Sequence, residues 1–255
     1  MNAPLVLGCG LGGVVVGSVL GAFATRVRAP VPVPAPAVPG GVPVLPPAVP
    51  DVAPLPSGAD VPGGSGRVAL DRLAAGVVTG GLLAVAAHHF GAVPALAAYC
   101  VLFVGLVAVS VVDLRVGLVP RTVIYPVSVL LGVALVAASA VAGDWRALGE
   151  AVIGGALAFA VFFAIWFLYP RGLGFGDVRL AAAIGFGLGW LGLLHLYVGF
   201  LVGFLAGAAF GLVVMVRRGT GRKTRMPFAP ALAVGAVVGV IWGSQIINAW
   251  LPGHS

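Results

Sequence analysis

Residues 73–112 read LAAGVVTGGLLAVAAHHFGAVPALAAYCVLFVGLVAVSVV, forty residues without Asp, Glu, Lys or Arg. The hydrocarbon core of a bilayer is ~30 Å thick and is crossed by about 20 helical residues. The run is therefore long enough for two membrane-spanning helices, and Gly91-Ala92-Val93-Pro94 predicts a turn between them. This stretch places the chain among helical membrane proteins.

The composition of the whole chain leads to the same class. Of its 255 residues, 60% are hydrophobic and 8% charged, and the mean hydropathy is +1.14. A soluble globular domain is about 45–50% apolar and about a quarter charged. A water-soluble fold is therefore excluded.

Charged residues divide the chain into uncharged runs, which cover residues 1–25, 73–112, 122–143, 151–170, 180–216 and 226–255. Four of these runs fit one span each, and two fit a pair, the second pair turning between Trp190 and His195. The runs lack polar alternation, and barrel strands need only about 9–11 residues, so helices are favoured over strands. We expect an all-α polytopic protein with eight transmembrane helices.

The basic residues predict the orientation, because Lys and Arg mark cytoplasmic loops. With both termini outside, thirteen of the 14 basic residues fall on the cytoplasmic side and only Arg146 lies outside. We therefore expect a multi-pass protein of the inner or plasma membrane. The net charge of +7 then follows from topology, and no nucleic-acid partner is expected.

The segment 29–66 differs from the rest, with twelve of the 20 prolines between Pro30 and Pro62. Proline fixes φ and has no backbone donor, so we predict an extended cytoplasmic linker rather than a ninth span. The chain is thus divided into a first helix at 1–28, the linker at 29–66 and a seven-helix core at 67–255.

The spacing of the glycines and the isolation of the two cysteines suggest that these residues serve helix packing. Glycines four apart occur in three spans, at Gly13, Gly17 and Gly21, at Gly203, Gly207 and Gly211, and at Gly235, Gly239 and Gly243. Such spacing lets a neighbouring helix approach closely. Cys9 and Cys100 are too far apart in sequence to indicate a metal site or a disulfide framework. No metal or cofactor is expected.

Most of the seven acidic residues have ordinary explanations. Five lie in the linker, beside a basic residue or next to the outside loop, namely Asp51, Asp60, Asp71, Asp144 and Glu150. Asp113 and Asp177 instead adjoin apolar spans on the same predicted membrane face. An acid at such a position is costly and indicates function.

The surroundings of these two acids leave two interpretations open. Asp113 could pair with Arg115 or Arg121, and Asp177 with Arg179, as interfacial ion pairs. Alternatively, the glycines at 172, 174 and 176 permit unusual dihedral angles or close approach of another backbone, as an active-site loop would require. Two neighbouring carboxyl groups cannot both ionise easily, so one keeps a proton and the pair can catalyse hydrolysis.

Other hydrolytic mechanisms lack the necessary residues. The chain has no His-Glu-x-x-His pair for zinc. His88, His89 and His195 fall near the predicted outer ends of their spans, so a serine–histidine mechanism has no base at the depth of Asp113 and Asp177.

Three motifs resemble the type IV prepilin peptidases, membrane aspartic proteases of the Gly-x-Gly-Asp class. The first is Asp113 followed by Leu118-Val119-Pro120. The second is the stretch GFGDVRL, residues 174–180, similar to the family's Gly-x-Gly-Asp-x-Lys-Leu. The third is PFAPALA, residues 227–233, similar to the Pro-Phe-Gly-Pro segment before the last helix.

The resemblance implies cleavage of a short basic leader from pilin-like precursors at the cytoplasmic membrane face. Asp113 and Asp177 would be the catalytic pair. The residues implied for the active-site loop or substrate binding are Gly172, Gly174, Gly176, Arg179, Pro120, Pro227, Phe228 and Pro230. Many members carry a domain with paired cysteines after the first helix; here the proline linker replaces it, which leaves the N-methyltransferase activity doubtful.

Two other classes share parts of this pattern. Pro230-Ala231-Leu232 also resembles the presenilin and signal-peptide-peptidase class, in which the first aspartate lies within a span. Asp113 is instead expected to open a loop, which favours the prepilin peptidases. The non-enzymatic alternative is a transporter or channel that uses Asp113 and Asp177 as an ion relay.

Helix dipoles predict how a proton would be shared by the pair. Asp113 is expected to end one helix and Asp177 to begin another. The dipoles would then favour protonation of Asp113 and ionisation of Asp177.

Overall fold

The computed structural model describes residues 3–26, 64–117, 119–170, 172–218 and 228–251, and helices make up nearly all of them, with no strand in these ranges. The helices are α1 (Ala3–Arg26), α2 (Gly64–Phe90), α3 (Ala95–Val116), α4 (Arg121–Ala142), α5 (Trp145–Leu168), α6 (Phe175–Leu191), α7 (Leu193–Arg218), α8 (Ala229–Ile241) and α9 (Gly243–Trp250). The expected all-α class is confirmed.

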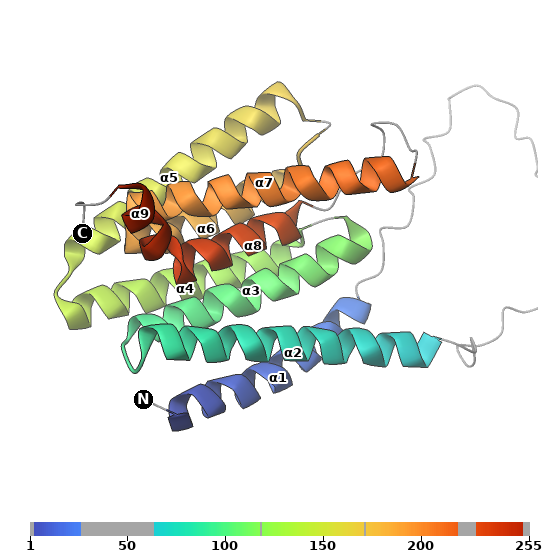
Figure 1. Cartoon of the computed structure of the whole chain (residues 1–255), viewed down its shortest axis with the longest axis horizontal. Coiled ribbons are helices and arrows are strands. Elements are labelled where there is room, and N and C mark those ends of the chain that lie inside the picture. The colour runs from blue at the N-terminus through green and yellow to red at the C-terminus, as the bar shows by residue number, and fades with distance from the viewer. Residues whose placement is uncertain (1–2, 27–63, 118, 171, 219–227, 252–255) are drawn as a thin grey trace, which may run out of the picture.

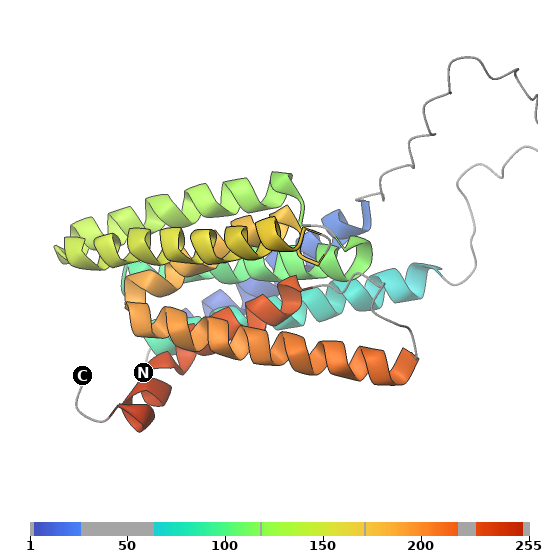
Figure 2. The ribbon, with the colours of Figure 1, turned by 90° about the horizontal axis from the view of Figure 1, so that it is seen from above.

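The long helices run roughly parallel to one another in a bundle (Figures 1 and 2). α1 packs on α2, α5 on α6 and α7 on α8, while α3 contacts α1, α2, α4, α6 and α8. The side chains of Tyr99, Leu102 and Phe103 on α3 are fully buried. α3 is therefore the central helix, and its last turns position the site described below.

Five helical segments are long and apolar enough to cross a membrane: Arg72–Phe90, Ala95–Arg115, Arg121–Ala142, Trp145–Leu168 and Leu193–Val214. α8 and α9 meet at a bend of 72° and together could form a sixth. The chain is thus a multi-pass membrane protein. The expected number of eight spans is not reached by these criteria, because α6 has only 17 residues and the apolar part described for α1 ends at Ser18.

The expected turns occur where the sequence indicates them. α2 ends at Phe90 and α3 begins at Ala95, with Gly91 at φ 67°. α6 and α7 are separated by Gly192, whose φ of 127° belongs to a region that side chains rarely occupy.

The linker expected at 29–66 lies mostly outside the described residues. Its predicted end is three residues too late, because α2 already begins at Gly64. No proline follows Pro62 in this region, so nothing prevents the helix from extending through Gly64–Gly66.

Glycines bring several helices into close contact, as their spacing predicts. A Cβ atom at Gly13 would lie 2.8 Å from the Cα of Gly80, so α1 and α2 meet backbone to backbone. A Cβ atom at Gly235 would lie 2.6 Å from the Cα of Gly203, so α7 and α8 do the same. Cys9 on α1 and Cys100 on α3 are free thiols that pack against the hydrophobic core, which agrees with a packing role.

Replacing Gly235 by Leu should separate α8 from α7, because the new side chain would overlap the backbone of Gly199 and Gly203. Overpacking of this kind costs about 1–3 kcal/mol. Denaturant unfolding in detergent micelles measures the loss. The matched control is Gly81→Leu, since no atom lies within 4 Å of a Cβ at Gly81. Equal stability of the two variants would contradict this packing.

Candidate active site

Asp113 lies in the last turn of α3 and is 5% exposed. The helix continues for three residues to Val116 and ends at Gly117, whose φ of 67° is the left-handed conformation that glycine adopts most easily. The N–H of Gly117 donates to the carbonyl oxygen of Asp113 at 2.8 Å. The expectation that Asp113 opens a loop is therefore wrong, because the glycine that stops the helix comes four residues later.

The start of α8 meets the Asp113 side chain. The N–H of Ala229 donates to Oδ2 of Asp113 at 3.0 Å. Ala229 is the first residue of α8, and free N–H groups at a helix N-terminus carry partial positive charge. The protein thus supplies the Asp113 carboxyl with a hydrogen-bond donor, which a lipid environment could not do.

Phe228 and Pro230 hold this helix start in place. The ring of Phe228 lies 6.4 Å from the ring of Phe162 on α5 and 5.8 Å from that of Phe204 on α7, between centroids. Pro230 is the second residue of α8, where its missing N–H costs no helical hydrogen bond. Pro227, the first residue of the same motif, lies outside the described residues.

Asp177 lies in the first turn of α6. The N–H of Gly174 donates to Oδ2 of Asp177 at 3.1 Å, and the N–H of Asp177 donates to the carbonyl of Gly174 at 3.0 Å. An acid at the third helical position commonly reaches back in this way to the residue that caps the helix. Both acidic side chains therefore accept a backbone N–H at the start of a helix.

The glycines before Asp177 permit close approach rather than unusual dihedral angles. A Cβ at Gly176 would lie 2.6 Å from the Cβ of Val119, and one at Gly174 would lie 3.2 Å from Oδ2 of Asp177. A side chain on Gly172 would overlap the ring of Tyr169. None of these three glycines has a positive φ. Gly176 therefore lies against the backbone of Val119, whereas Gly172 and Gly174 are approached by side chains.

The carboxyl groups of Asp113 and Asp177 interact. Asp177 precedes the uncharged run that begins at Leu180. Burial, and then the negative charge of Asp113, raise the pKa of Asp177 from 3.8 to about 6, against the opposing hydrogen bond from Gly174. The raised pKa favours the protonated form of Asp177. The dipole prediction does not include the N-terminus of α8, which faces Asp113, because the order of helices along the chain does not reveal this contact.

The structure separates Arg179 from this pair. Two residues along a helix correspond to a rotation of about 200°, so Arg179 points to the other side of α6. Its guanidinium lies 4.5 Å from the centroid of the Phe175 ring and 5.3 Å from that of Tyr125. The alternative ion pair between Asp177 and Arg179 does not form.

Pro120 borders the site from α4. It has an extended conformation with φ −72° and ψ 132°, and its carbonyl accepts the N–H groups of Val123 and Ile124 at the start of the helix. Val119, the residue before it, packs against Gly176. The connection between α3 and α4 thus lies against the start of α6.

An apolar groove of about 580 Å³ lies beside Asp113, between α2, α3 and α8. Its walls include Ser110, Leu114 and Pro230. The hydroxyl of Ser110, three residues before Asp113, is buried and has no hydrogen-bond partner among the described residues. Within the same residues, no group of three or more His, Cys, Asp or Glu could hold a metal ion.

Sequence reasoning missed the backbone donor of Ala229 and the buried hydroxyl of Ser110. The proline at 230 indicates a helix start, but it cannot show which side chain that start faces. Nothing in the pattern around Ser110 distinguishes it from an ordinary small residue in a span.

Fold and site together define a helical multi-pass membrane protein with two interacting carboxyl groups at one end of its bundle. Residues 100–214 match the type IV leader peptidase family. This segment holds both Asp113 and Asp177, together with the first two of the three motifs.

Relatives extend the similarity beyond this segment. The prepilin leader peptidase/N-methyltransferase of Stutzerimonas stutzeri is 30% identical over 192 residues, which cover 73% of this chain and 62% of that protein. The protein of the same name from Pseudomonas aeruginosa is 30% identical over 190 residues, covering 72% and 61%. That from Xanthomonas campestris pv. campestris is 30% identical over 151 residues, covering 57% and 50%.

The chain spans between half and about three fifths of the length of these relatives. No solved structure matches it.

Infrared spectroscopy of the purified protein should show a protonated carboxyl that is lost as the pH rises through about 6, the raised pKa of Asp177. Asp177→Asn should remove this band. Asp113→Asn should keep it but move its loss to lower pH, because the charge that raises the pKa of Asp177 is gone. If the band survives Asp177→Asn, a carboxyl group other than Asp177 holds the proton and this prediction is wrong.

Proposed function

We propose that this protein is a membrane aspartic endopeptidase that removes the basic leader from type IV prepilin-like precursors. The observation that carries the proposal is the pair of interacting carboxyl groups, Asp113 and Asp177, each held by a backbone N–H at a helix start. The match of residues 100–214 to the leader peptidase family and the names of the relatives support it.

The protonation of the pair suits hydrolysis without a covalent intermediate. Asp113, ionised, would accept a proton from water as its oxygen attacks the carbonyl carbon of the scissile peptide. Asp177, protonated, would donate its proton to the carbonyl oxygen. The C–N bond of the tetrahedral intermediate then breaks as the proton taken up by Asp113 passes to the leaving nitrogen. One hydroxyl of the intermediate returns its proton to Asp177 as the new carboxyl group forms, which restores the pair.

The substrate would reach the pair at the end of the bundle where α3 ends and α6 and α8 begin. Gly172, Gly174 and Gly176 shape the loop beside Asp177, and Val119, next to Pro120, packs against Gly176. Phe228 and Pro230 form the opposite side, where the apolar groove next to Asp113 offers a surface for an apolar part of the precursor. We place this end at the cytoplasmic face of the plasma membrane, following the distribution of basic residues, with both termini outside.

Only the peptidase activity is part of this proposal. The names of the relatives include an N-methyltransferase, but the chain spans only between half and about three fifths of their lengths. There is no cysteine between Cys9 and Cys100, so the paired-cysteine domain that the family resemblance associates with methylation has no counterpart at residues 29–66.

Single replacement of either carboxyl should abolish cleavage. Asp113→Asn or Asp177→Asn should lower the cleavage rate of a co-expressed pilin-like precursor at least 10²- to 10⁴-fold, the contribution of general acid–base catalysis. Mobility of the precursor on a gel reports leader removal, and membrane fractionation reports insertion of the variant. Asp144→Asn is the matched control, because Asp144 caps α5 through Ala147 and Asn caps equally well.

Normal cleavage by either variant would refute the dyad. If ion-dependent uptake into proteoliposomes requires both acids while no precursor is processed, the protein is a transporter. If the reconstituted protein cuts peptide bonds within a membrane span but leaves precursor leaders intact, it belongs functionally with the presenilin class.

The close contact at Gly176 should also be needed for activity. Gly176→Ala places a methyl group against Val119 and moves the start of α6, and a shift of 1 Å can cost about a hundredfold in rate. Gly149→Ala is the control, because nothing lies within 4 Å of a Cβ there. Precursor cleavage at matched protein levels is the measurement. An unchanged rate in Gly176→Ala would show that Val119 yields without moving Asp177.

A further inference from the structure

A second groove lies on the side of α6 that faces away from the carboxyl pair. It has a volume of about 640 Å³ and is formed by α4, α5 and α6. The groove exists because α5 packs tightly on α6 while α4 stands apart: a Cβ at Gly154 would meet the backbone of Gly185, whereas no atom lies within 4 Å of one at Gly132.

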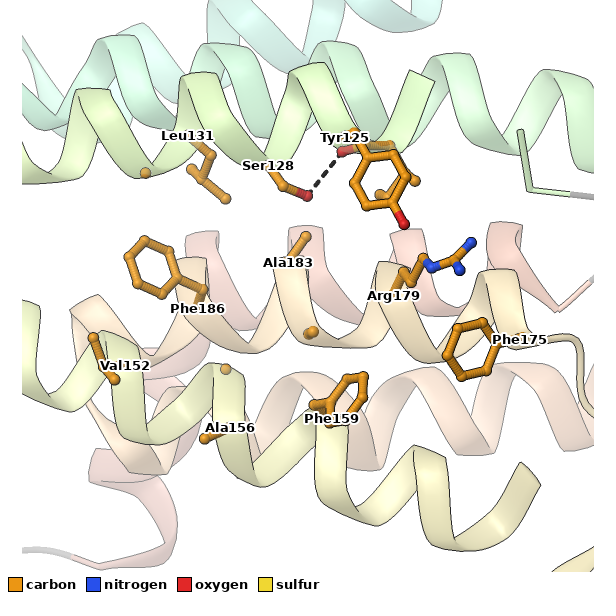
Figure 3. Close-up of a pocket in the computed structure, with 14 residues that line it drawn as sticks. Tyr125, Ser128, Leu131, Val152, Ala156, Phe159, Phe175, Arg179, Ala183 and Phe186 are labelled. Carbon is orange, nitrogen blue, oxygen red and sulfur yellow. Dashed lines mark hydrogen bonds between the residues drawn. The ribbon is translucent and has the colours of Figure 1, made fainter. Parts of the chain in front are cut away.

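The walls of this groove are almost entirely apolar. They consist of Ile124, Tyr125, Ser128, Leu131, Gly132, Val152, Gly155, Ala156, Phe159, Phe175, Arg179, Ala182, Ala183 and Phe186. The hydroxyl of Ser128 already donates to the carbonyl of Ile124 at 2.8 Å. An occupant therefore meets polar side chains only near Arg179 and Tyr125, at one end of the groove (Figure 3).

Arg179 is a half-buried cation whose charge is not balanced by a neighbouring acid. Its guanidinium lies over the ring faces of Phe175 and Tyr125, and no acid among the described residues pairs with it. Aromatic faces cover the plane of a guanidinium, but its N–H donors lie at the edge of that plane and remain available to oxygens. Phosphate oxygens fit such donors in pairs.

The position of the charge relative to the apolar walls identifies the ligand. Arg179 precedes the uncharged run that begins at Leu180, and α4 enters its own uncharged run after Arg121. From this edge of the apolar layer the groove extends past Ala183 toward Phe186 and Val152 (Figure 3). One charged end and a long apolar remainder match a phospholipid, and basic pockets between transmembrane helices are known to bind anionic head groups.

We propose that this groove binds an anionic phospholipid, with its phosphate at Arg179 and an acyl chain along the apolar surface of α4, α5 and α6. Binding of the lipid bridges α4 to the α5–α6 pair across the gap at Gly132. The site is separate from the carboxyl pair and does not depend on the proposed peptidase activity.

Native mass spectrometry of the full chain, exchanged into mixed vesicles of phosphatidylglycerol and phosphatidylcholine and then extracted, tests this proposal. The protein should retain phosphatidylglycerol preferentially. Arg179→Gln should lower the ratio of the two lipids about fivefold, the factor that ~1 kcal/mol per basic residue represents. Arg179→Lys should keep part of the preference.

Two further variants separate the lipid site from general charge and folding. Arg146→Gln removes one positive charge from the far end of the bundle, where Arg146 pairs with Glu150, and should leave the ratio unchanged. Gly132→Phe should lower retention of both lipids by filling the groove, whereas Gly81→Phe, on α2, should not. Circular dichroism confirms that each variant is folded.

Three results would overturn the proposal. The wild-type protein could retain both lipids equally, or Arg179→Gln could keep the full preference for phosphatidylglycerol. A photo-crosslinker at Ser128 could also capture the co-expressed precursor instead of lipid, which would assign the groove to the substrate. Loss of cleavage activity alone would affect only the peptidase proposal.

Discussion

Two carboxyl groups at the edge of an apolar bundle must find their hydrogen bonds within the protein, because hydrocarbon offers none. In the structure, backbone N–H groups at the starts of two helices provide these hydrogen bonds. Ala229 at the beginning of α8 donates to Asp113, and Gly174 before α6 donates to Asp177. The end of α3 and the starts of α6 and α8, which are remote in sequence, therefore lie close together. The packing of the rest of the bundle holds them in this arrangement.

The convergence depends on close helix packing elsewhere. α8 can lie against α7 because Gly199, Gly203 and Gly235 leave no side chains between them, and the ring of Phe228 fixes where α8 begins. α6 is held by α5 through glycines in the same way. The two sides of α6 then have different environments: Asp177 faces the end of α3, whereas Arg179 faces the groove under α4. A cation two residues from an acid thus lies on a different surface, and Arg179 does not lower the pKa of Asp177.

Much of the fold could be predicted because bilayer thickness translates directly into the length of an apolar run. The turns at Gly91–Pro94 and near Gly192 follow from glycine and proline placed between such runs. The number of spans could not be predicted in the same way. An uncharged run sets an upper limit on helix length, but Gly192 and the charged start at Asp177 restrict α6 to 17 residues.

The sequence by itself determined the class of the protein, the two acids without an ordinary role, and the glycines that must accept a close neighbour, because these follow from local composition and spacing. Only the tertiary structure decided that the start of α8 lies against Asp113, where the N–H of Ala229 donates to its carboxyl. It also decided that the side chain of Arg179 points away from the two carboxyl groups. Both outcomes depend on which helix ends meet in space, and that pairing is set by long-range packing rather than by any residue's neighbours along the chain.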